Sequence, residues 1–323
     1  MVATSKVQHP ATGKARRNGP AARRRRRPAD ARKIMGGIRP YLFLAPFMIS
    51  FFIFTIVPIG YAIWLSLFRV QLIGGRQFAG FSNYAAVFRQ PAFWSGVLRV
   101  SVLGVVQVPV MLGLALFFAL VFDTIVVGRA GAIYRVIYFV PYAVPGVISA
   151  LMWGYLYDNQ LSPFDAMMHG AHLGSPDFLS PGLLLPAIGN LETWQFVGYN
   201  MIVLYVALQA IPPEVRQAAI VDGASLRHIW LRINVPLVRT GLLLTTVMSI
   251  IGTLQMFTEP DVLMGFTPSV TSSYTPNLMI YSVAFNEQNL NYAAALSLVL
   301  GVITIVVIVG VLIVNNRRRG MRI

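Results

Sequence analysis

The chain has 323 residues, of which 56% are hydrophobic and only 11% are charged. Soluble domains carry about 25% charged residues, so this composition excludes an ordinary soluble protein and predicts an integral membrane protein. The absence of cysteine excludes a disulfide framework or a thiolate metal site. The histidines lack metal-ligand spacing apart from His169 and His172 in a loop, so no metal site is predicted.

The formal net charge of +15 is concentrated at the start of the chain. Residues 6–39 hold 12 of the 26 Lys and Arg residues and a single acid, Asp30. We expect residues 1–39 to form a disordered, basic cytoplasmic tail that fixes topology and contacts anionic lipid headgroups. The Arg run at 23–27 also fits nucleic-acid binding, but its place just before a membrane span favours lipid, so no nucleic-acid partner is expected.

Six apolar runs follow the tail, each close to the roughly 20 residues that a helix needs to cross a bilayer. Helices are favoured because backbone groups in lipid must be hydrogen-bonded internally. The first run far exceeds the about 7–15 apolar residues of a signal peptide. Pro141 and Pro145 are expected to kink the third. The expected spans are Tyr41–Phe68 and, approximately, Val100–Val126, Ile133–Tyr155, Leu183–Ala210, Gly241–Phe257 and Tyr292–Val314.

These runs predict an all-α membrane protein with a six-helix transmembrane domain over residues 40–315 and a short basic tail over residues 316–323. Six spans place both termini on one side of the cell membrane, and the positive-inside rule puts that side in the cytoplasm. Residues 69–99 hold four Arg and no acid yet fall outside in this topology. Because the N-terminal tail is much more basic than residues 69–99, we assign the orientation from the tail.

One charged segment interrupts the apolar pattern between the fourth and fifth spans. Its first half, "PEVRQAAIV", predicts a short helix that begins at Pro213, carries Glu214 in its first turn and ends at Asp222. Gly223 suits the left-handed residue that follows a helix C-terminus. Ser225 can cap a second short helix, which Pro236 is expected to end.

The same segment admits two interpretations at this level. Its small residues and two angled helices are suited to docking into a partner protein. Its Arg and Trp residues also suit an amphipathic link lying on the bilayer surface.

The stretch "EVRQAAIVDGASLRHIWLRINVP" resembles the EAA loop of ATP-binding-cassette (ABC) importer permeases. Ala218 and Ala219 match its alanines, residues 222–224 match its Asp-Gly-Ala, and Ile233 and Pro236 match its end. The sequence departs from the pattern at Gln217, where Glu is usual, at Trp230, where Phe is common, and at Thr240, where Pro is often found.

The resemblance extends in order over roughly residues 40–314. "FAGFSNYAAVFRQPAFW" is similar to the first external loop of MalF-like carbohydrate permeases, and "FVGYNMIVLYVALQAIPPEV" resembles the run into their EAA loop. "TLQMFTEPDVLMGFTP" and "NLMIYSVAF…NYAAALSLVL" resemble their fifth and sixth spans. The resemblance implies a type I importer permease fold and a chain that pairs with a second, homologous permease.

Further partners follow from the resemblance. The protein partners are an ABC ATPase dimer in the cytoplasm and an extracytoplasmic solute-binding protein. The expected substrate is a sugar, either a disaccharide or an oligosaccharide. The chain itself has no Walker A pattern and no nucleophile–base constellation, so no enzyme activity or cofactor is expected on it, and ATP and Mg²⁺ would bind the ATPase. By resemblance, contact with the ATPase is expected from Glu214, Gln217, Ala218, Ala219, Asp222, Gly223, Ala224 and Pro236. Gly223→Asp is predicted to abolish uptake while the protein still inserts.

Polar residues inside the spans are the candidates for the substrate pathway, because ionisable groups in lipid are costly and commonly functional. Glu192 lies at helical spacing from Gln195 and Tyr199. An alternative places Glu192 near the outer end of the fourth span, in contact with interfacial water. The expected pathway residues are Glu192, Gln195, Tyr199, Asn200, Gln255, Asn291 and Tyr292.

Other functions remain open at this level. A permease of the same family could carry glycerol 3-phosphate, but the absence of Lys and Arg from Val136 to Thr258, apart from the EAA loop and Arg239 just after it, favours a neutral sugar. An ion-driven secondary transporter would show internal repeats and charged midplane sites, and neither is visible. A membrane-anchored scaffold using the Arg-rich tail is a third class.

Overall fold

The computed structural model describes residues 39–71, 75–126, 128–158, 162, 167 and 176–320. Most of the basic tail (residues 1–38), His169 and His172 lie outside these residues. The chain divides into two units, Met1–Pro58 and Ile59–Ile323, which are described separately.

The described part of the first unit is helical throughout. It comprises α2 (Arg39–Phe51), the π-helical turn η1 (Phe52–Ile56) and the start of α3 (Val57–Ser66). Pro58 lies two residues after the π turn; proline lacks the N–H that an α-helix requires, and a wider turn before it accommodates that loss. The stretch Phe43–Ser66 is long and apolar enough to cross a membrane, which confirms the first expected span.

A small hairpin follows α3, contrary to the purely helical prediction. Strands β1 (Phe68–Gln71) and β2 (Gly75–Phe78) pair antiparallel, and the short helix α4 (Ser82–Phe88) comes next. The buried Asn83 amide fixes the hairpin, because Nδ2 donates to Ser66 O at 2.7 Å and to Phe68 O at 2.8 Å. Strands this short leave little hydrophobic pattern in a sequence.

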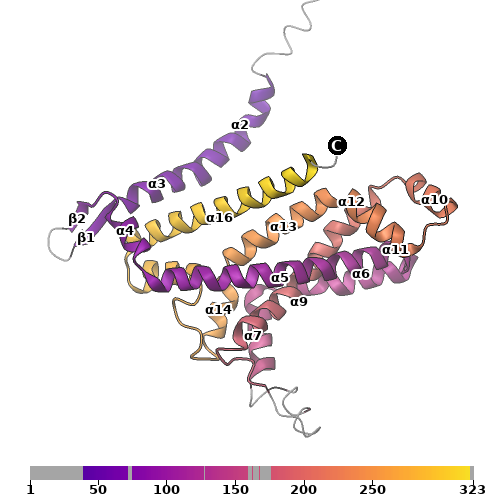
Figure 1. Cartoon of the computed structure of the whole chain (residues 1–323). Helices are drawn as coiled ribbons and strands as arrows, with labels where there is room; N and C mark the ends of the chain where they lie inside the picture. The colour runs from indigo at the N-terminus through magenta and orange to yellow at the C-terminus, as the bar shows by residue number, and fades with distance from the viewer. Residues whose placement is uncertain are drawn as a thin grey trace, which may run out of the picture. The chain divides into compact units, whose positions relative to one another are not determined.

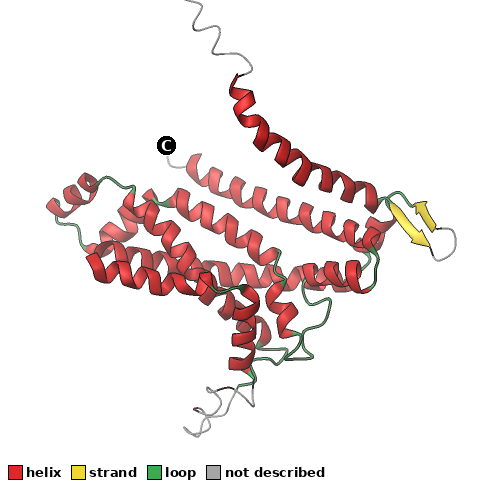
Figure 2. Cartoon of the chain, turned by 180° about the vertical axis from the view of Figure 1, so that it is seen from behind, coloured by secondary structure: helices red, strands yellow, loops and turns green. Residues whose placement is uncertain are grey.

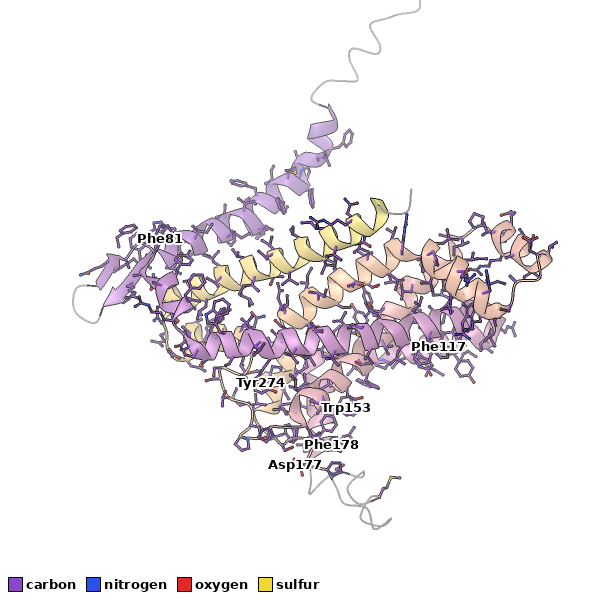
Figure 3. The ribbon with its side chains drawn as sticks, in the orientation of Figure 1. Phe81, Phe117, Trp153, Asp177, Phe178 and Tyr274 are labelled. Atoms are coloured by element: carbon purple, nitrogen blue, oxygen red, sulfur yellow. The ribbon has the colours of Figure 1, made fainter. Side chains whose placement is uncertain are left out.

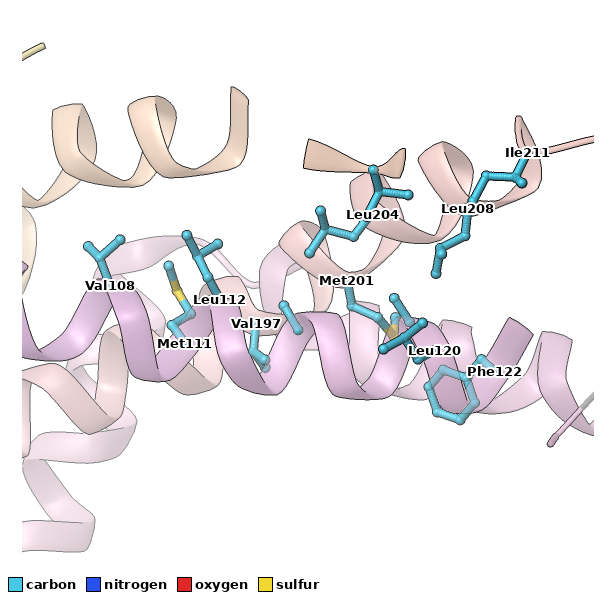
Figure 4. Close-up of a cluster of buried hydrophobic side chains, with 13 residues drawn as sticks. Val108, Met111, Leu112, Leu120, Phe122, Val197, Met201, Leu204, Leu208 and Ile211 are labelled. Carbon is cyan, nitrogen blue, oxygen red and sulfur yellow. The ribbon is translucent and has the colours of Figure 1, made fainter. Parts of the chain in front are cut away.

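The core of the second unit is built on α5 (Pro91–Thr124) and α9 (Leu184–Gln209), with α6 (Gly128–Ala143) packed against α9. Figure 4 shows the apolar cluster between α5 and α9, with Met111 and Leu120 facing Met201 and Leu204. These helices bury side chains against each other and expose apolar residues elsewhere, as expected for helices surrounded by lipid.

The third expected span is broken in two. α6 ends at Ala143 and α7 (Gly146–Tyr157) begins after Pro145, with a bend of 93° between them. Figure 1 shows α7 turned away from α6. The expected proline kink is therefore confirmed, and it is sharp because Pro145 cannot continue the helical hydrogen-bond ladder.

The last third of the chain supplies α13 (Arg239–Leu254), α14 (Thr258–Leu263), α15 (Pro276–Tyr281), the π turn η3 (Ser282–Asn286) and α16 (Leu290–Gly320). Figure 2 draws the helices in red and the loops that connect them in green. α16 continues past the expected span end at Val314. In the described residues, four helical stretches can cross a membrane by length and composition, and up to six if each bent helix pair counts as one span.

Aromatic residues support the end of the second unit where α7 lies. In Figure 3, Trp153 and Phe178 lie at this end. Trp153 packs on Trp194 with ring centroids 5.8 Å apart, and the Tyr157 hydroxyl donates to Ala187 O at 3.1 Å. Tyr157 therefore has a packing role in addition to any role at the membrane interface.

A cation–π contact joins α5 to the loop between α14 and α15. The guanidinium of Arg99 lies 5.0 Å from the ring centroid of Tyr274 and donates to Tyr274 O at 3.3 Å. Burial raises the pKa of the Tyr274 hydroxyl, and the nearby Arg99 charge opposes that rise. The contact fixes this loop against the start of α5.

Candidate functional site: a charged two-helix segment and a polar cavity

The charged segment forms two short helices at the end of the second unit opposite the hairpin (Figure 1). The first, α10 (Pro213–Val221), starts at a proline, carries Glu214 in its first turn and is bent by 75° from α9. All three features follow from the sequence, because Pro213 fits the first helical position and the preceding Pro212 interrupts α9.

The turn after α10 has the left-handed geometry that the sequence predicts. Gly223 has φ of 77°, Gly223 N donates to Ile220 O at 3.0 Å, and Ala224 N donates to Ala219 O at 2.9 Å. These two bonds form a Schellman motif, which satisfies the last carbonyls of the helix. A Cβ at Gly223 would meet nothing within 4 Å, so the constraint there comes from the backbone conformation.

The second helix is longer than expected. It begins after Ser225, whose hydroxyl accepts from His228 N at 3.4 Å, as predicted. It then continues through α11 (Leu226–His228), the π turn η2 (Ile229–Asn234) and α12 (Val235–Leu237). The expectation that Pro236 ends this helix is wrong, because the π turn before it accommodates the missing N–H and the break falls at Val238.

Three polar side chains tie α10 to the ends of α5 and α9, and we call Asp123, Gln209 and Arg216 the Asp123 latch. Arg216 Nη1 lies 2.7 Å from Asp123 Oδ2, and Gln209 Nε2 donates to Asp123 Oδ1. Arg216 Nη2 also donates to Leu208 O at 3.0 Å. The latch is not among the features predicted from the sequence, although Asp123 is the one acid of the second expected span and needs a partner there.

A further hydrogen bond joins the second short helix to α5. Trp230 Nε1 donates to Thr124 Oγ1 at 3.1 Å, and the Trp230 ring packs against Phe117 with centroids 6.4 Å apart. Figure 3 shows Phe117 on α5. Both short helices are therefore anchored to the same end of α5.

The residues expected to contact an ATPase are mostly accessible. Ala219 is buried within the segment and Ala224 is half-buried, whereas the other six are exposed: Glu214, Gln217, Ala218, Asp222, Gly223 and Pro236. A hollow of about 520 Å³ opens at the turn, lined by Ala219, Asp222, Gly223, Ala224, Ser225, His228 and Ile233.

A polar cavity of about 330 Å³ lies among α5, α6, α9, α13 and α14. Four of the expected pathway residues line it: Glu192, Tyr199, Asn200 and Gln255. The other lining residues are Gln107, Met111, Tyr142, Phe196, Met248, Ser249, Gly252, Thr253, Met256, Phe257, Thr258 and Glu259. The lining therefore combines carboxyl, amide, hydroxyl and aromatic groups and contains no Lys or Arg.

Two carboxyl groups meet in this cavity. Glu192 of α9 is 9% exposed and Glu259 of α14 is 7% exposed, and both side chains line the cavity. The alternative in which Glu192 meets interfacial water does not fit this burial. Glu259, which follows the fifth expected span in the sequence, lines the same cavity as Glu192, because α14 packs on α7 and α7 contacts α9.

Two buried amides in the cavity have oxygens without a hydrogen-bond partner. Asn200 is 2% exposed; its Nδ2 donates to Phe196 O at 3.0 Å, but Oδ1 accepts no bond from the described residues. Gln107 is 5% exposed, and its Oε1 is likewise unpartnered in the described part of the chain. Gln107 is not among the pathway residues predicted from the sequence, although an amide in the middle of an apolar span is a signal that could have identified it.

An aromatic pair completes the lining. The rings of Tyr142 and Tyr199 are stacked, with centroids 4.7 Å apart and an interplanar angle of 24°. Tyr142 lies just before the bend at Pro145, so the broken span places this ring beside α9.

Three of the expected pathway residues lie outside the cavity. Gln195 is buried and donates from Nε2 to Val144 O at 3.4 Å. Asn291 Nδ2 donates to Leu65 O at 2.8 Å, which joins α16 to α3. Tyr292 packs against the apolar cluster that includes Phe93 and Leu296. No group of three or more potential metal ligands occurs among the described residues.

Residues 84–320 match the protein family described as the binding-protein-dependent transport system inner membrane component. The chain belongs to this family. The match includes the two short helices, the Asp123 latch and every residue that lines the cavity. The chain is therefore a multi-pass membrane component of a transport system.

Several transport permeases are similar to this chain over most of its length, as expected for a member of this family. The trehalose/maltose permease MalF of Thermococcus litoralis is 29% identical over 252 residues, covering 77% of this chain and 83% of that protein. The diacetylchitobiose permease NgcF of Streptomyces coelicolor is 27% identical over 293 residues, covering 86% of this chain and 82% of that protein. The sn-glycerol-3-phosphate permease UgpA of Agrobacterium fabrum is 26% identical over 270 residues, covering 83% of this chain and 91% of that protein.

The fold is also that of a solved ABC importer. A chain of a bacterial ABC transporter involved in the import of the acidic polysaccharide alginate matches with a TM-score of 0.76 and 19% identity, covering 89% of this chain and 98% of that chain. The expected fold of an ABC importer permease is therefore confirmed.

Proposed function

We propose that this protein is one of two permease subunits of an ABC importer that carries a sugar of the di- or oligosaccharide class into the cell. The observation that carries the cargo assignment is the cavity, in which the stacked rings of Tyr142 and Tyr199 lie with buried amide and carboxyl oxygens. Sugars present hydroxyl donors and apolar C–H faces, and this lining offers acceptors for the first and aromatic faces for the second.

The cavity does not favour an anionic cargo. Phosphate is held in proteins by Arg, Lys or clustered N–H donors, and no Lys or Arg lines this cavity. The UgpA relatives are glycerol-3-phosphate permeases, so that cargo stays the second candidate. The absence of basic lining residues favours the neutral sugar.

The charged segment is proposed as the contact with an ATPase dimer on the cytoplasmic side. Its exposed residues, Glu214, Gln217, Ala218, Asp222 and Gly223, surround the turn, and Pro236 lies on the second helix. ATP and Mg²⁺ would bind the ATPase, because the sequence of this chain contains no P-loop pattern. Closure of the ATPase dimer would move this segment and switch the permease between its two orientations.

The proposal also covers the sides of the membrane and the remaining partners. Both termini and the charged segment face the cytoplasm, in agreement with the positive-inside rule. A second, homologous permease completes the pathway, and an extracytoplasmic binding protein delivers the sugar. A solved alginate transporter was determined in complex with a pentasaccharide-bound periplasmic protein, which supports a partner of this kind.

The proposal is tested by reconstituting the importer from this chain and its partner subunits. This chain would be co-expressed with the second permease and the ATPase, purified as a complex and placed in proteoliposomes with the binding protein. ATP hydrolysis and uptake are measured with a panel of maltose, trehalose, lactose, diacetylchitobiose and glycerol 3-phosphate. We expect a neutral disaccharide to stimulate both activities.

Two results would contradict the proposal. Stimulation by glycerol 3-phosphate alone would replace the sugar with the second candidate. Uptake that needs no ATPase and collapses when an ionophore dissipates the ion gradient would indicate a secondary transporter.

A further inference from the structure

The hairpin formed by β1 and β2 has an apolar face and a polar face. Residues that lie opposite each other in an antiparallel pair share a face of the sheet, and so do alternate residues along a strand. The pairs on one face are Phe68 with Phe78 and Val70 with Arg76, and the pair on the other face is Arg69 with Gln77. We call the first set the apolar face of the hairpin, because Arg76 is its only charged member.

The polar face is bonded to the protein, whereas the apolar face is left uncovered. Arg69 Nε donates to Asn83 Oδ1 at 2.9 Å, and Arg69 Nη2 donates to Ser82 O at 3.2 Å, so the polar face is held to the start of α4. On the apolar face, Phe78 is 71% exposed and Val70 is 66% exposed. An exposed group of apolar side chains on a rigid element indicates a surface that meets lipid or another molecule.

A row of aromatic rings makes the apolar face continuous with the surface of α3. The ring centroids are 5.8 Å apart for Tyr61 and Trp64, 4.8 Å for Trp64 and Phe68, and 5.6 Å for Phe68 and Phe78. Tyr61 and Trp64 are exposed, and α3 ends the apolar stretch Phe43–Ser66 that can cross a membrane. Figure 1 shows the two strands at this end of α3. Because Trp and Tyr concentrate where a span meets water, the row places the hairpin at the level of the lipid headgroups.

The charges of the hairpin fit the same environment. The guanidinium of Arg76 lies 5.0 Å from the ring centroid of Trp64, and it has no carboxylate partner in the described part of the chain. Residues 69–99 contain no acid at all. Arg binds phosphate through two parallel hydrogen bonds, and phosphate is the anion that lies just outside the apolar core of a bilayer. A protein partner could also accept an apolar face with one Arg, but lipid already surrounds the neighbouring surface of α3, so lipid is favoured.

We propose that the hairpin is a membrane anchor, whose apolar face lies at the boundary between acyl chains and headgroups with Arg76 on a phospholipid phosphate. Interfacial aromatic and Arg anchors fix the depth and tilt of the helix to which they are attached, which here is α3. Only the choice of the outer leaflet rests on the proposed function; the contact with lipid does not. The anchor also gives Arg76 a partner in the positive segment 69–99, which the proposed topology places outside.

Spin labels on the two faces of the hairpin test the anchor. The chain has no cysteine, so Val70→Cys and Gln77→Cys each place one labelled thiol, on the apolar face and on the polar face respectively. Each variant is purified with the subunits that accompany it and placed in vesicles of phosphatidylethanolamine and phosphatidylglycerol. Electron paramagnetic resonance then compares collisions of the label with oxygen, which concentrates in lipid, and with a water-soluble nickel chelate. We expect the Val70→Cys label to favour oxygen and the Gln77→Cys label to favour the chelate, with the cysteine-free parent as background.

Three results for the Val70→Cys label would overturn the proposal. Collision mainly with the nickel chelate would place the apolar face in water. Shielding from both reagents would place it under another subunit. Shielding that arises only when an extracytoplasmic binding protein is added would make this face a docking surface for that protein. None of these measurements depends on transport, so failure of the proposed function would leave them unaffected.

The phosphate contact of Arg76 is tested in the same labelled Val70→Cys protein. Arg76→Glu should move the label toward water, with fewer oxygen collisions and more chelate collisions, because a carboxylate repels phosphate. Arg76→Lys keeps the positive charge and should keep the label at its original depth. Arg89→Glu, at an exposed position after α4 and outside the apolar face, is the matched control and should not move it. An unchanged depth in Arg76→Glu, or an equal shift in Arg89→Glu, would overturn the phosphate contact.

Discussion

At the scale of single residues, Gly223 is constrained by its backbone and not by its neighbours. Its φ of 77° is a conformation that residues with a Cβ rarely adopt, although open space surrounds it. For an L-residue this conformation costs about 1–2 kcal/mol, which lowers the population of the turn roughly 5–30-fold. We expect Gly223→Val to reduce uptake by a factor in this range while the protein still inserts. Radiolabelled sugar uptake per unit of membrane-inserted protein measures the effect.

Two variants serve as controls for Gly223. Gly223→Asn should retain more uptake than the valine variant, because Asn tolerates the left-handed region. Gly182→Val, at an exposed position with no atom within 4 Å of an added Cβ and no left-handed φ, should leave uptake unchanged. Equal activity of Gly223→Val and wild type would show that the Schellman turn is not needed for transport.

Gly198 is constrained in the opposite way, by a neighbouring backbone. A Cβ there would overlap the carbonyl oxygen of Tyr138, so α6 or α9 would have to move. Overpacking of this kind costs about 1–3 kcal/mol. We expect Gly198→Ala to lower the melting temperature of the purified protein, as followed by fluorescence-detected size-exclusion chromatography. Gly301→Ala, on α16 with no neighbour within 4 Å, should not lower it. An unchanged melting temperature for Gly198→Ala would contradict the close packing of α6 on α9.

At the scale of elements, the Asp123 latch decides how α10 is held. Loss of Arg216 would leave the Asp123 side chain, which has no exposed surface, without its cation. Hydrogen bonds to charged groups contribute about 1.5–3 kcal/mol, so Arg216→Ala should loosen α10 from α5 and α9. We expect ATP hydrolysis to continue with reduced sugar stimulation. The ratio of stimulated to basal ATPase activity in proteoliposomes measures this loss of coupling.

Exchanging the charges of Asp123 and Arg216 tests whether the ion pair itself is needed for coupling. Asp123→Arg combined with Arg216→Asp should recover part of the stimulation that either single variant loses, as expected for residues in direct contact. Arg129→Ala, which removes an exposed Arg at the start of α6, is the control for lost positive charge. A swap variant no better than the single variants would contradict a role for the ion pair.

The sequence predicts well those elements that are determined by residues close to them in the chain. Long apolar runs predict the spans, Pro145 predicts the bend, and Gly223 and Ser225 predict the caps, because each signal lies within a few residues of its effect. The end of the second short helix is misplaced because Pro236 is normally a stop signal. Only the π turn before it lets the helix continue.

The parts of the site that the sequence does not predict depend on contacts between distant segments. Asp123 meets Arg216 only after α5 and α10 have packed, and Glu192 and Glu259 line one cavity only after α9 and α14 have come together. Asn291 illustrates the reverse, because a polar residue near a span mouth is used to bind the Leu65 carbonyl and lies away from the cavity. Periodicity and composition carry no information on which polar residues will pair.

At the scale of the second unit, the same two helices carry both functional regions. α5 holds Gln107 in the cavity and Asp123 in the latch, and α9 holds Asn200 in the cavity and Gln209 in the latch. At a rise of 1.5 Å per residue, these pairs are separated along their helices by about 24 Å and about 14 Å. We therefore expect movement of α10 to reach the cavity through two rigid helices that pack along each other, and not through a flexible link.

This arrangement requires the charged segment and the loop after α7 to lie on opposite sides of the membrane, and the natural lack of cysteine makes the requirement testable. Val221→Cys places a thiol at an 87% exposed position beside the turn, and Gly182→Cys places one before α9. In intact cells, a membrane-impermeant maleimide should label the second variant and spare the first. Both should be labelled after the cells are permeabilised, and the cysteine-free parent sets the background. Labelling of Val221→Cys in intact cells would place the segment outside and contradict its contact with a cytoplasmic ATPase.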